Sequence, residues 1–202
     1  MTTATSCTAL RRPAAIAATG PVPSSASAGN GSPSWRPTAI LSSQASPSSR
    51  FGSPKAFAEF EGATLAERAW ALLAEVCGER IAVGRLEGLP FPALEDEGTG
   101  PVAAIAAGLR DATRDVAVVI PVDMPLLTPD ALRLLADVCR DAAVAQAGPL
   151  PCAVARSALP AFETGERRLR TVLDGLDTAP VELDPSVLAN VNTRSDLDTL
   201  AP

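Results

Sequence analysis

The chain has 202 residues, of which 47% are apolar and only 3% aromatic, and its formal net charge is −6 at pH 7. This length and composition fit one α/β domain with an Ala-, Leu- and Val-rich core. The acidic balance argues against nucleic acid as the main partner. No uncharged apolar run is long enough to span a bilayer, so we expect no membrane contact.

The absence of certain residue types limits the chemistry. The sequence has no histidine and no tyrosine, which removes the commonest general base and every Ser-His or Cys-His dyad. Its four cysteines lie far apart without CxxC spacing, so we expect neither a zinc site nor disulfides, and a cytoplasmic protein. Carboxylates, amides, Lys, Arg and a hard cation remain, which suits nucleotidyl transfer.

Residues 1–36 are rich in Ser, Ala, Pro and Gly and contain no Asp or Glu, since the first acidic residue is Glu59. This composition predicts a low-complexity, disordered leader over residues 1–36, followed by a single domain over residues 37–202. An acid-free segment with Arg11 and Arg12 also fits an organellar transit peptide, which is the alternative interpretation.

Short apolar strands and amphipathic helices alternate after the leader, an order typical of a mainly parallel sheet with helices on both faces. Thr64 and Glu67 form a capping-box signature, which predicts a helix through Val76 that Gly78 can close. The strands expected around this helix are Thr38–Leu41 and Ile81–Val83.

The middle of the chain carries the clearest strand. Pro101 stands at a first helical position, and apolar residues recur at helical spacing after it. Val116–Ile120 is a continuous apolar, β-branched run that Pro121 stops, as in a buried parallel strand. Asp123 is therefore expected just beyond the carboxyl end of this strand.

The C-terminal part continues the alternation. Thr128 and Pro129 predict a helix start, and we expect this helix to run to about Ala142. The elements predicted next are strands at Ala143–Ala147 and Cys152–Ala155, a helix over Glu166–Leu176, a strand at Pro180–Leu183 and a closing segment at Ser195–Leu200.

Three polar segments follow predicted strands: Arg50–Lys55, Asp123–Pro125 and Asn190–Thr193. Ligands of open α/β sheets bind outside the carboxyl ends of the strands, so these segments are expected to meet in one crevice. In this order they resemble the molybdenum cofactor guanylyltransferase family, the MobA-like NTP transferases, over Thr38 to Leu200. The resemblance implies a three-layer, Rossmann-like α/β nucleotidyltransferase fold.

The first segment resembles the family's phosphate loop, LAGGxSxRxGxxK. Ser48, Arg50, Gly52 and Lys55 match it, which implies that they bind the nucleotide phosphates, with Arg50 and Lys55 catalytic. Where the family has Gly-Gly, this chain has Gln44–Ser46, although glycine lets the backbone approach phosphate closely. A non-catalytic nucleotide-binding descendant and a misread frame or start before Ser48 are therefore both alternatives.

The resemblance also implies a metal site. It makes Asp123 a catalytic ligand of Mg²⁺, with Asn192 as the amide partner. Taken alone, Asp123 is a turn or cap residue. Asn190 and Asn192 point the same way from extended backbone, with Val191 opposite. Alternatively, one of these asparagines, or Thr193, caps the terminal helix.

The remaining candidates lie on the base and acceptor sides. Asp96, with Gly100 after it, resembles the nucleotide-binding carboxylate that recognises guanine, and is equally an exposed loop charge. Arg170 and Asn190 resemble the family's acceptor side, where an arginine pairs with the pterin phosphate. Arg170 is alternatively an ordinary arginine on a helix surface.

The resemblance thus implies transfer of GMP from GTP to molybdopterin, giving the guanine dinucleotide cofactor and pyrophosphate. The implied cofactor is Mg²⁺, and the implied partners are GTP, molybdopterin or the molybdenum cofactor, and molybdoenzymes or cofactor carriers. A related nucleotidyltransferase with another acceptor or CTP is the nearest alternative, because one fold hosts many substrates.

Overall fold

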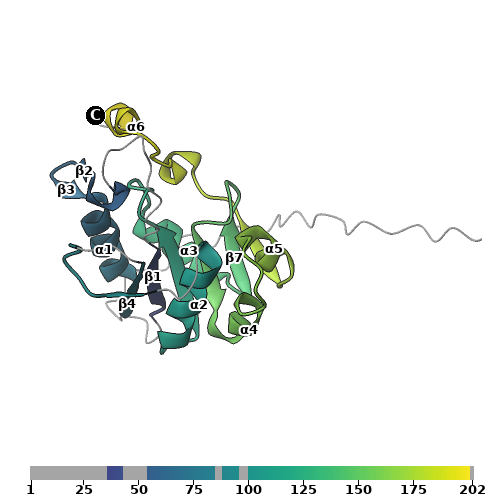
Figure 1. Cartoon of the computed structure of the whole chain (residues 1–202). Coiled ribbons are helices and arrows are strands. Elements are labelled where there is room, and N and C mark those ends of the chain that lie inside the picture. Colours follow the sequence, from purple (N-terminus) through teal and green to yellow (C-terminus); the bar gives the residue numbers. More distant parts are fainter. Residues whose placement is uncertain (1–35, 43–53, 85–87, 96–99, 201–202) are drawn as a thin grey trace, which may run out of the picture. The chain divides into compact units, whose positions relative to one another are not determined.

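A computed structural model describes residues 36–42, 54–84, 88–95 and 100–200 (Figure 1). The helices are α1 (Leu65–Val76), α2 (Pro101–Asp111), α3 (Pro129–Asp137), α4 (Leu159–Phe162), α5 (Leu169–Asp174) and α6 (Arg194–Leu200), with 3₁₀ turns η1 (Lys55–Phe57), η2 (Arg156–Ala158) and η3 (Pro185–Leu188). The strands are β1 (Thr38–Ser42), β2 (Glu59–Phe60), β3 (Ala63–Thr64), β4 (Glu79–Val83), β5 (Ala93–Leu94), β6 (Val116–Pro121), β7 (Ala142–Ala145), β8 (Cys152–Ala155) and β9 (Thr178–Val181).

Seven strands form one mixed, mainly parallel sheet in the order β5-β4-β1-β6-β8-β7-β9. β1 pairs in parallel with β4 on one side and β6 on the other, so Ser42 stands beside both Val83 and Pro121. β8 is antiparallel to both of its neighbours, β6 and β7. The carboxyl ends of β4, β1 and β6 therefore meet at one edge, where ligands of such sheets bind.

Helices cover both faces of the sheet. All five residues of β1 are buried, and they alternate between the two faces because successive side chains point oppositely. Ala39 and Leu41 pack in a cluster with α1 and α3, whereas Ile40 packs in a second cluster with α2 and α5. The expected three-layer α/β architecture is confirmed.

The packing of α2 on the sheet depends on one small residue. Gly108 lies over Ile40 so closely that an added Cβ would stand 2.6 Å from the Ile40 Cδ1 atom. Glycine lowers helix propensity at this position, but it lets the helix backbone approach the strand.

Most predicted elements are present, but several of their ends differ from the prediction. β4 begins at Glu79 instead of Ile81, β7 ends at Ala145 instead of Ala147, and α5 ends at Asp174 instead of Leu176. Helix α3 stops at Asp137 instead of about Ala142, because Ala142 begins β7 and pairs in register with Thr178 of β9. The strand predicted at Pro180–Leu183 is β9, which spans Thr178–Val181 and so begins two residues earlier. Helix α5 begins at Leu169 instead of Glu166. The Glu166 carboxylate accepts hydrogen bonds from the backbone N–H groups of Arg167 and Arg168, which lie just before the helix.

The structure also bears on the ends of the domain. The predicted leader lies outside the described residues except for Arg36, whose guanidinium donates to the backbone oxygens of Ala74, Glu75 and Val76 at the end of α1. None of the helices in the described part of the chain is long and apolar enough to cross a membrane.

Candidate active site

Three polar side chains from distant parts of the sequence meet beyond the sheet. The Lys55 ammonium lies 3.3 Å from Oδ2 of Asp123 and donates a 2.9 Å hydrogen bond to Oδ1 of Asn192. Lys55 belongs to η1, Asp123 follows β6, and Asn192 precedes α6. We call Lys55, Asp123 and Asn192 the polar triad; the structure brings together one residue from each of the three predicted segments.

Packing fixes where Asp123 and Asn192 stand. β6 ends at Pro121, and the next side chain, Val122, is buried while that of Asp123 is 18% exposed. Val191 is fully buried, and its backbone N–H donates to the carbonyl oxygen of Asp123 at 2.8 Å. The predicted inward direction of Val191 is confirmed, and the next side chain, that of Asn192, faces Lys55.

The N-terminus of α6 holds the backbone of Asn192. The Asp196 carboxylate accepts hydrogen bonds from the backbone N–H groups of Asn192 at 2.7 Å and Thr193 at 2.8 Å. Thr193 Oγ1 in turn accepts from the backbone N–H of Asp196, so Thr193 is the cap among the three alternatives. These bonds, first that from Asn192, hold the pKa of Asp196 below its ordinary value.

The triad has the donor atoms of a magnesium site. Asp123 Oδ1 is buried and has no hydrogen-bond partner among the described residues, although a buried oxygen normally has one. The described residues hold no cluster of three or more Asp, Glu or Cys side chains able to bind a metal. One carboxylate and one amide fit a hard cation that takes its other oxygens from water and phosphate.

Several predicted residues are not in the triad. Ser48, Arg50, Gly52 and Asp96 lie outside the described residues. Gly100 precedes α2 with φ +107°, a left-handed conformation that favours glycine.

The two predicted acceptor residues are exposed. Asn190 lies on the segment between η3 and α6, and Arg170 lies on α5, where it lines a hollow of about 180 Å³ beside β7 and β9. Among the described residues, no hydrogen bond or ion pair joins either side chain to the triad.

The cysteines of the described residues are unsuited to nucleophilic catalysis. Burial raises the pKa of the Cys77 thiol to about 12 and that of Cys139 to about 11, and it raises the pKa of Cys152 as well. Thiols with such pKa values stay protonated at neutral pH. A cysteine nucleophile among the described residues is therefore not expected.

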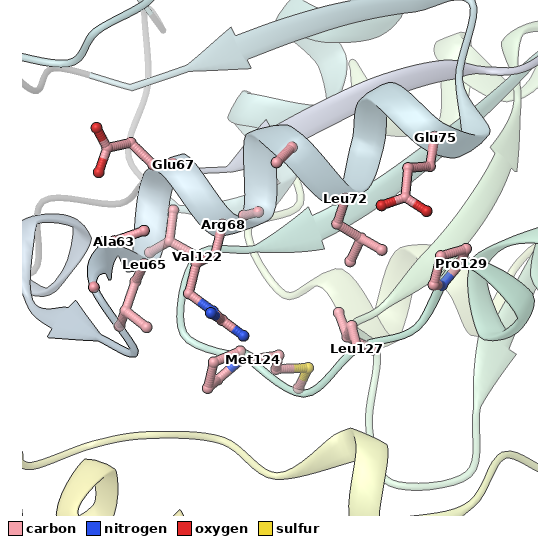
Figure 2. Close-up of a pocket in the computed structure, with 14 residues that line it drawn as sticks. Ala63, Leu65, Glu67, Arg68, Leu72, Glu75, Val122, Met124, Leu127 and Pro129 are labelled. Carbon is pink, nitrogen blue, oxygen red and sulfur yellow. The ribbon is translucent and has the colours of Figure 1, made fainter. Parts of the chain in front are cut away.

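Sequence reasoning missed a second hollow, of about 680 Å³, between α1 and the loop that follows β6 (Figure 2). Arg68 points into it, with its guanidinium 3.0 Å from the Glu61 carboxylate and 4.9 Å from the centre of the Phe60 ring. These partners are on the β2–β3 hairpin, so Arg68 ties the hairpin to α1. No triad residue lines this hollow.

The sequence also matches a known family over more than half of its length. The MobA-like NTP transferase domain matches residues 44–181. The chain belongs to this family. As a MobA-like nucleotidyltransferase, it acts on a nucleotide substrate.

Individual relatives support the assignment. The MobA-like chain is 34% identical to a probable molybdenum cofactor guanylyltransferase from Chloroflexus aggregans over 181 residues, covering 74% of this chain and 86% of the relative. A second probable molybdenum cofactor guanylyltransferase, from Bacillus cereus, is 34% identical over 89 residues, which cover 39% of this chain and 44% of the relative.

Solved structures share the fold. The crystal structure of molybdopterin-guanine dinucleotide biosynthesis protein A from Archaeoglobus fulgidus has a TM-score of 0.67 at 22% identity, covering 81% of this chain and 96% of that one. The 2-C-methyl-D-erythritol 4-phosphate cytidylyltransferase from Thermus thermophilus has a TM-score of 0.61 at 18% identity, covering 80% and 95%. The MobA-like fold of this chain is thus common to nucleotidyltransferases with different substrates.

Proposed function

We propose that this protein transfers GMP from GTP to molybdopterin or the molybdenum cofactor, giving the guanine dinucleotide cofactor and pyrophosphate. The observation that carries the proposal is the meeting of Lys55, Asp123 and Asn192 beyond the carboxyl ends of the parallel strands. The relationship to probable molybdenum cofactor guanylyltransferases supports this choice of nucleotide and acceptor. We assign the reaction to the cytoplasm, because Cys77, Cys139 and Cys152 are free thiols, as expected in a reducing compartment. Molybdoenzymes or cofactor carriers are the further partners that we propose.

The acceptor's phosphate oxygen attacks the α-phosphorus of GTP, and the bond from that phosphorus to the oxygen bridging to the β-phosphate breaks. Pyrophosphate leaves with the bridging oxygen, so no covalent enzyme intermediate forms. Arg50 and Lys55 stabilise the negative charge on the phosphates, and Ser48 and Gly52 complete the phosphate loop. Catalysis of this kind is mainly positioning and charge neutralisation.

Asp123 and Asn192 are the residues that would hold Mg²⁺, with the orphaned Oδ1 of Asp123 as a ready ligand. When bound, the cation neutralises phosphate charge and orients the triphosphate. Val191 contributes by anchoring Asp123 and Asn192 to each other through the backbone.

The other predicted residues define the two ends of the substrate path. We assign Asp96 and Gly100 to the nucleotide, with the Asp96 carboxylate accepting from the guanine edge. We assign Asn190 and Arg170 to the acceptor, because an exposed guanidinium can pair with the pterin phosphate through two hydrogen bonds.

One feature favours a second candidate function. Gln44–Ser46 replace the glycines of the phosphate loop, and side chains there oppose close approach of the backbone to phosphate. A protein that binds nucleotide without turnover would carry such a change.

One assay separates these candidates. Purified full-length protein is incubated with Mg²⁺, molybdopterin and GTP labelled at the α-phosphate, and the pterin product is examined for label. We expect label from GTP and not from CTP. Label transferred from CTP but not from GTP would show that GTP is not the nucleotide substrate. Binding of GTP in calorimetry without any labelled product would support the non-catalytic candidate.

A further inference from the structure

Lys55 contacts one oxygen of each of the two proposed metal ligands. Its ammonium lies 2.9 Å from Asn192 Oδ1 and 3.3 Å from Asp123 Oδ2. An ammonium has three donors and no acceptor, so it competes with a hard cation for the same two side chains. The side chains of Lys55 and Asp123 are only 19% and 18% exposed, so water screens this contact incompletely.

We propose that Lys55 is a resident cation of the nucleotide-free protein, which excludes divalent metal from Asp123 and Asn192 until a triphosphate draws the ammonium away. This inference rests on the proposed function, because it makes metal entry depend on the nucleotide. It differs from that function in describing the protein before any substrate is bound.

The resident ammonium leaves the site incomplete. Asp123 Oδ1 stays buried without a partner among the described residues, while Oδ2 faces Lys55. A buried acceptor without a hydrogen bond is unfavourable, so the carboxylate keeps capacity for another ligand. A cation that binds the free oxygen of Asp123 can therefore displace the Lys55 ammonium.

Lys55 is suited to move. It stands at the start of the short turn η1, on a flexible four-carbon stem, and it follows Arg50 and Gly52 of the predicted phosphate loop by only a few residues. Phosphates bound by that loop would offer the ammonium more negative charge than one carboxylate shared with an amide. The same lysine thus contacts the metal ligands in the nucleotide-free protein and neutralises phosphate charge in the nucleotide-bound protein.

The proposal predicts opposite effects of one substitution. Lys55→Met should raise the affinity of nucleotide-free protein for Mn²⁺ at least about tenfold, because it removes both the competitor and a nearby like charge. The same variant should transfer GMP more slowly than the wild type. A lysine that served only to bind phosphate and stood clear of the metal ligands would leave Mn²⁺ binding unchanged.

The test is a titration of full-length, nucleotide-free protein with Mn²⁺, in which the electron paramagnetic resonance signal reports the free ion. Arg194→Met is the matched control, because it also removes one positive charge and Arg194 makes no hydrogen bond to Asp123 or Asn192 among the described residues. Lys55→Met combined with Asp123→Asn should lose the gained affinity.

The outcomes are distinct. Tighter Mn²⁺ binding by Lys55→Met alone supports the proposal. Unchanged or weaker binding overturns it, as does an equal gain in Arg194→Met or a gain that persists in the double variant. Lys55→Gln serves as a second variant if Lys55→Met does not melt cooperatively. The titration uses no GTP or pterin, so failure of the transfer assay with wild-type protein would count against the proposed function alone.

Discussion

The backbone N–H of Val191 donates a 2.8 Å hydrogen bond to the carbonyl oxygen of Asp123, joining the C-terminal segment to the loop after β6. Main-chain atoms make this bond, and Val191 is fully buried. The junction therefore survives a change of the Asp123 side chain, which lets the role of the carboxylate be tested separately from the fold.

Asp123→Ala should lower the rate of GMP transfer by about 10²–10³-fold, the usual effect of removing a group that stabilises transition-state charge. The melting temperature should change little, because the variant keeps the backbone bond to Val191. It loses one oxygen that has no partner and one whose 3.3 Å contact with Lys55 is a single, partly exposed ion pair. Transfer of label and thermal unfolding are measured in parallel.

Asp130→Ala is the matched control for this prediction. Asp130 is an aspartate in the first turn of α3, and its side chain is 92% exposed. This control should keep full activity. Wild-type activity in Asp123→Ala would remove Asp123 from the catalytic assignment.

Gly108→Ala should destabilise the protein by about 1–3 kcal/mol, the usual cost of overpacking a core. Alanine has the better helix propensity by about 1 kcal/mol, but its Cβ would stand 2.6 Å and 2.7 Å from Ile40 side-chain carbons. Chemical denaturation measures the free energy of unfolding. Gly175→Ala is the control, because a Cβ there meets no atom closer than 3.4 Å.

A double variant tests the cause. Ile40→Ala removes the atoms that the new methyl group would strike, so the combined loss in Gly108→Ala with Ile40→Ala should be smaller than the sum of the two single losses. Simple additivity would show that Ile40 is not the source of the strain.

Local sequence patterns predict those elements in which residue type, apolar pattern and the residues at the ends all indicate the same structure. Val116–Ile120 is apolar, β-branched and bounded by proline, and β6 spans it. Thr64 and Glu67 form the expected capping box before α1. The predicted helix overruns to Ala142 because alanine favours helices over strands, and the pairing of Ala142 with β9 overrides that preference.

Long-range relationships left no local signal. The two-residue strands β2, β3 and β5 are too short to show a period, and the antiparallel insertion of β8 between β6 and β7 depends on the whole sheet. Lys55 and Asn192 are 137 positions apart, and their convergence is predicted by the place of their segments after strands of an open sheet and by the family resemblance, not by a local pattern. Neither the pattern nor the resemblance predicted that Lys55 would contact both proposed metal ligands.

Thr64→Ala should lower the free energy of unfolding by about 1 kcal/mol, as expected for loss of an N-cap. Thr64 Oγ1 accepts from the backbone N–H of Glu67, and the Glu67 carboxylate accepts from the backbone N–H of Thr64. Thr128→Ala is the comparison, because Thr128 accepts one bond, from Ala131, without a reciprocal partner. Urea denaturation should show the larger loss for Thr64→Ala, because alanine also removes the 2.7 Å hydrogen bond that Thr64 Oγ1 donates to the Glu67 carboxylate. Equal losses would show that this second bond adds nothing to stability.

The stability contributed by Asp196 should depend on pH. Hydrogen bonds from the backbone N–H groups of Asn192 and Thr193 lower its pKa in the folded state. A lowered carboxyl pKa stabilises the fold above the unfolded-state pKa, about 3.9, and this contribution is lost as the pH falls through the folded-state pKa. Asp196→Asn has no carboxylate to ionise, so its melting temperature should lie below that of the wild type at pH 7 and approach it below about pH 4.

Asp198→Asn provides the comparison, because Asp198 lies in the same helix and accepts none of these bonds among the described residues. Thermal melts of the three proteins are recorded from pH 3 to pH 7, a range that includes the ordinary carboxyl pKa of about 3.9. They give the difference in melting temperature between each variant and the wild type at each pH. A deficit in Asp196→Asn that stays constant across this range would show that the carboxylate charge is not what stabilises the start of α6. A deficit that closes on acidification would identify the ionised Asp196 as the group that holds the backbone of Asn192 beside Lys55.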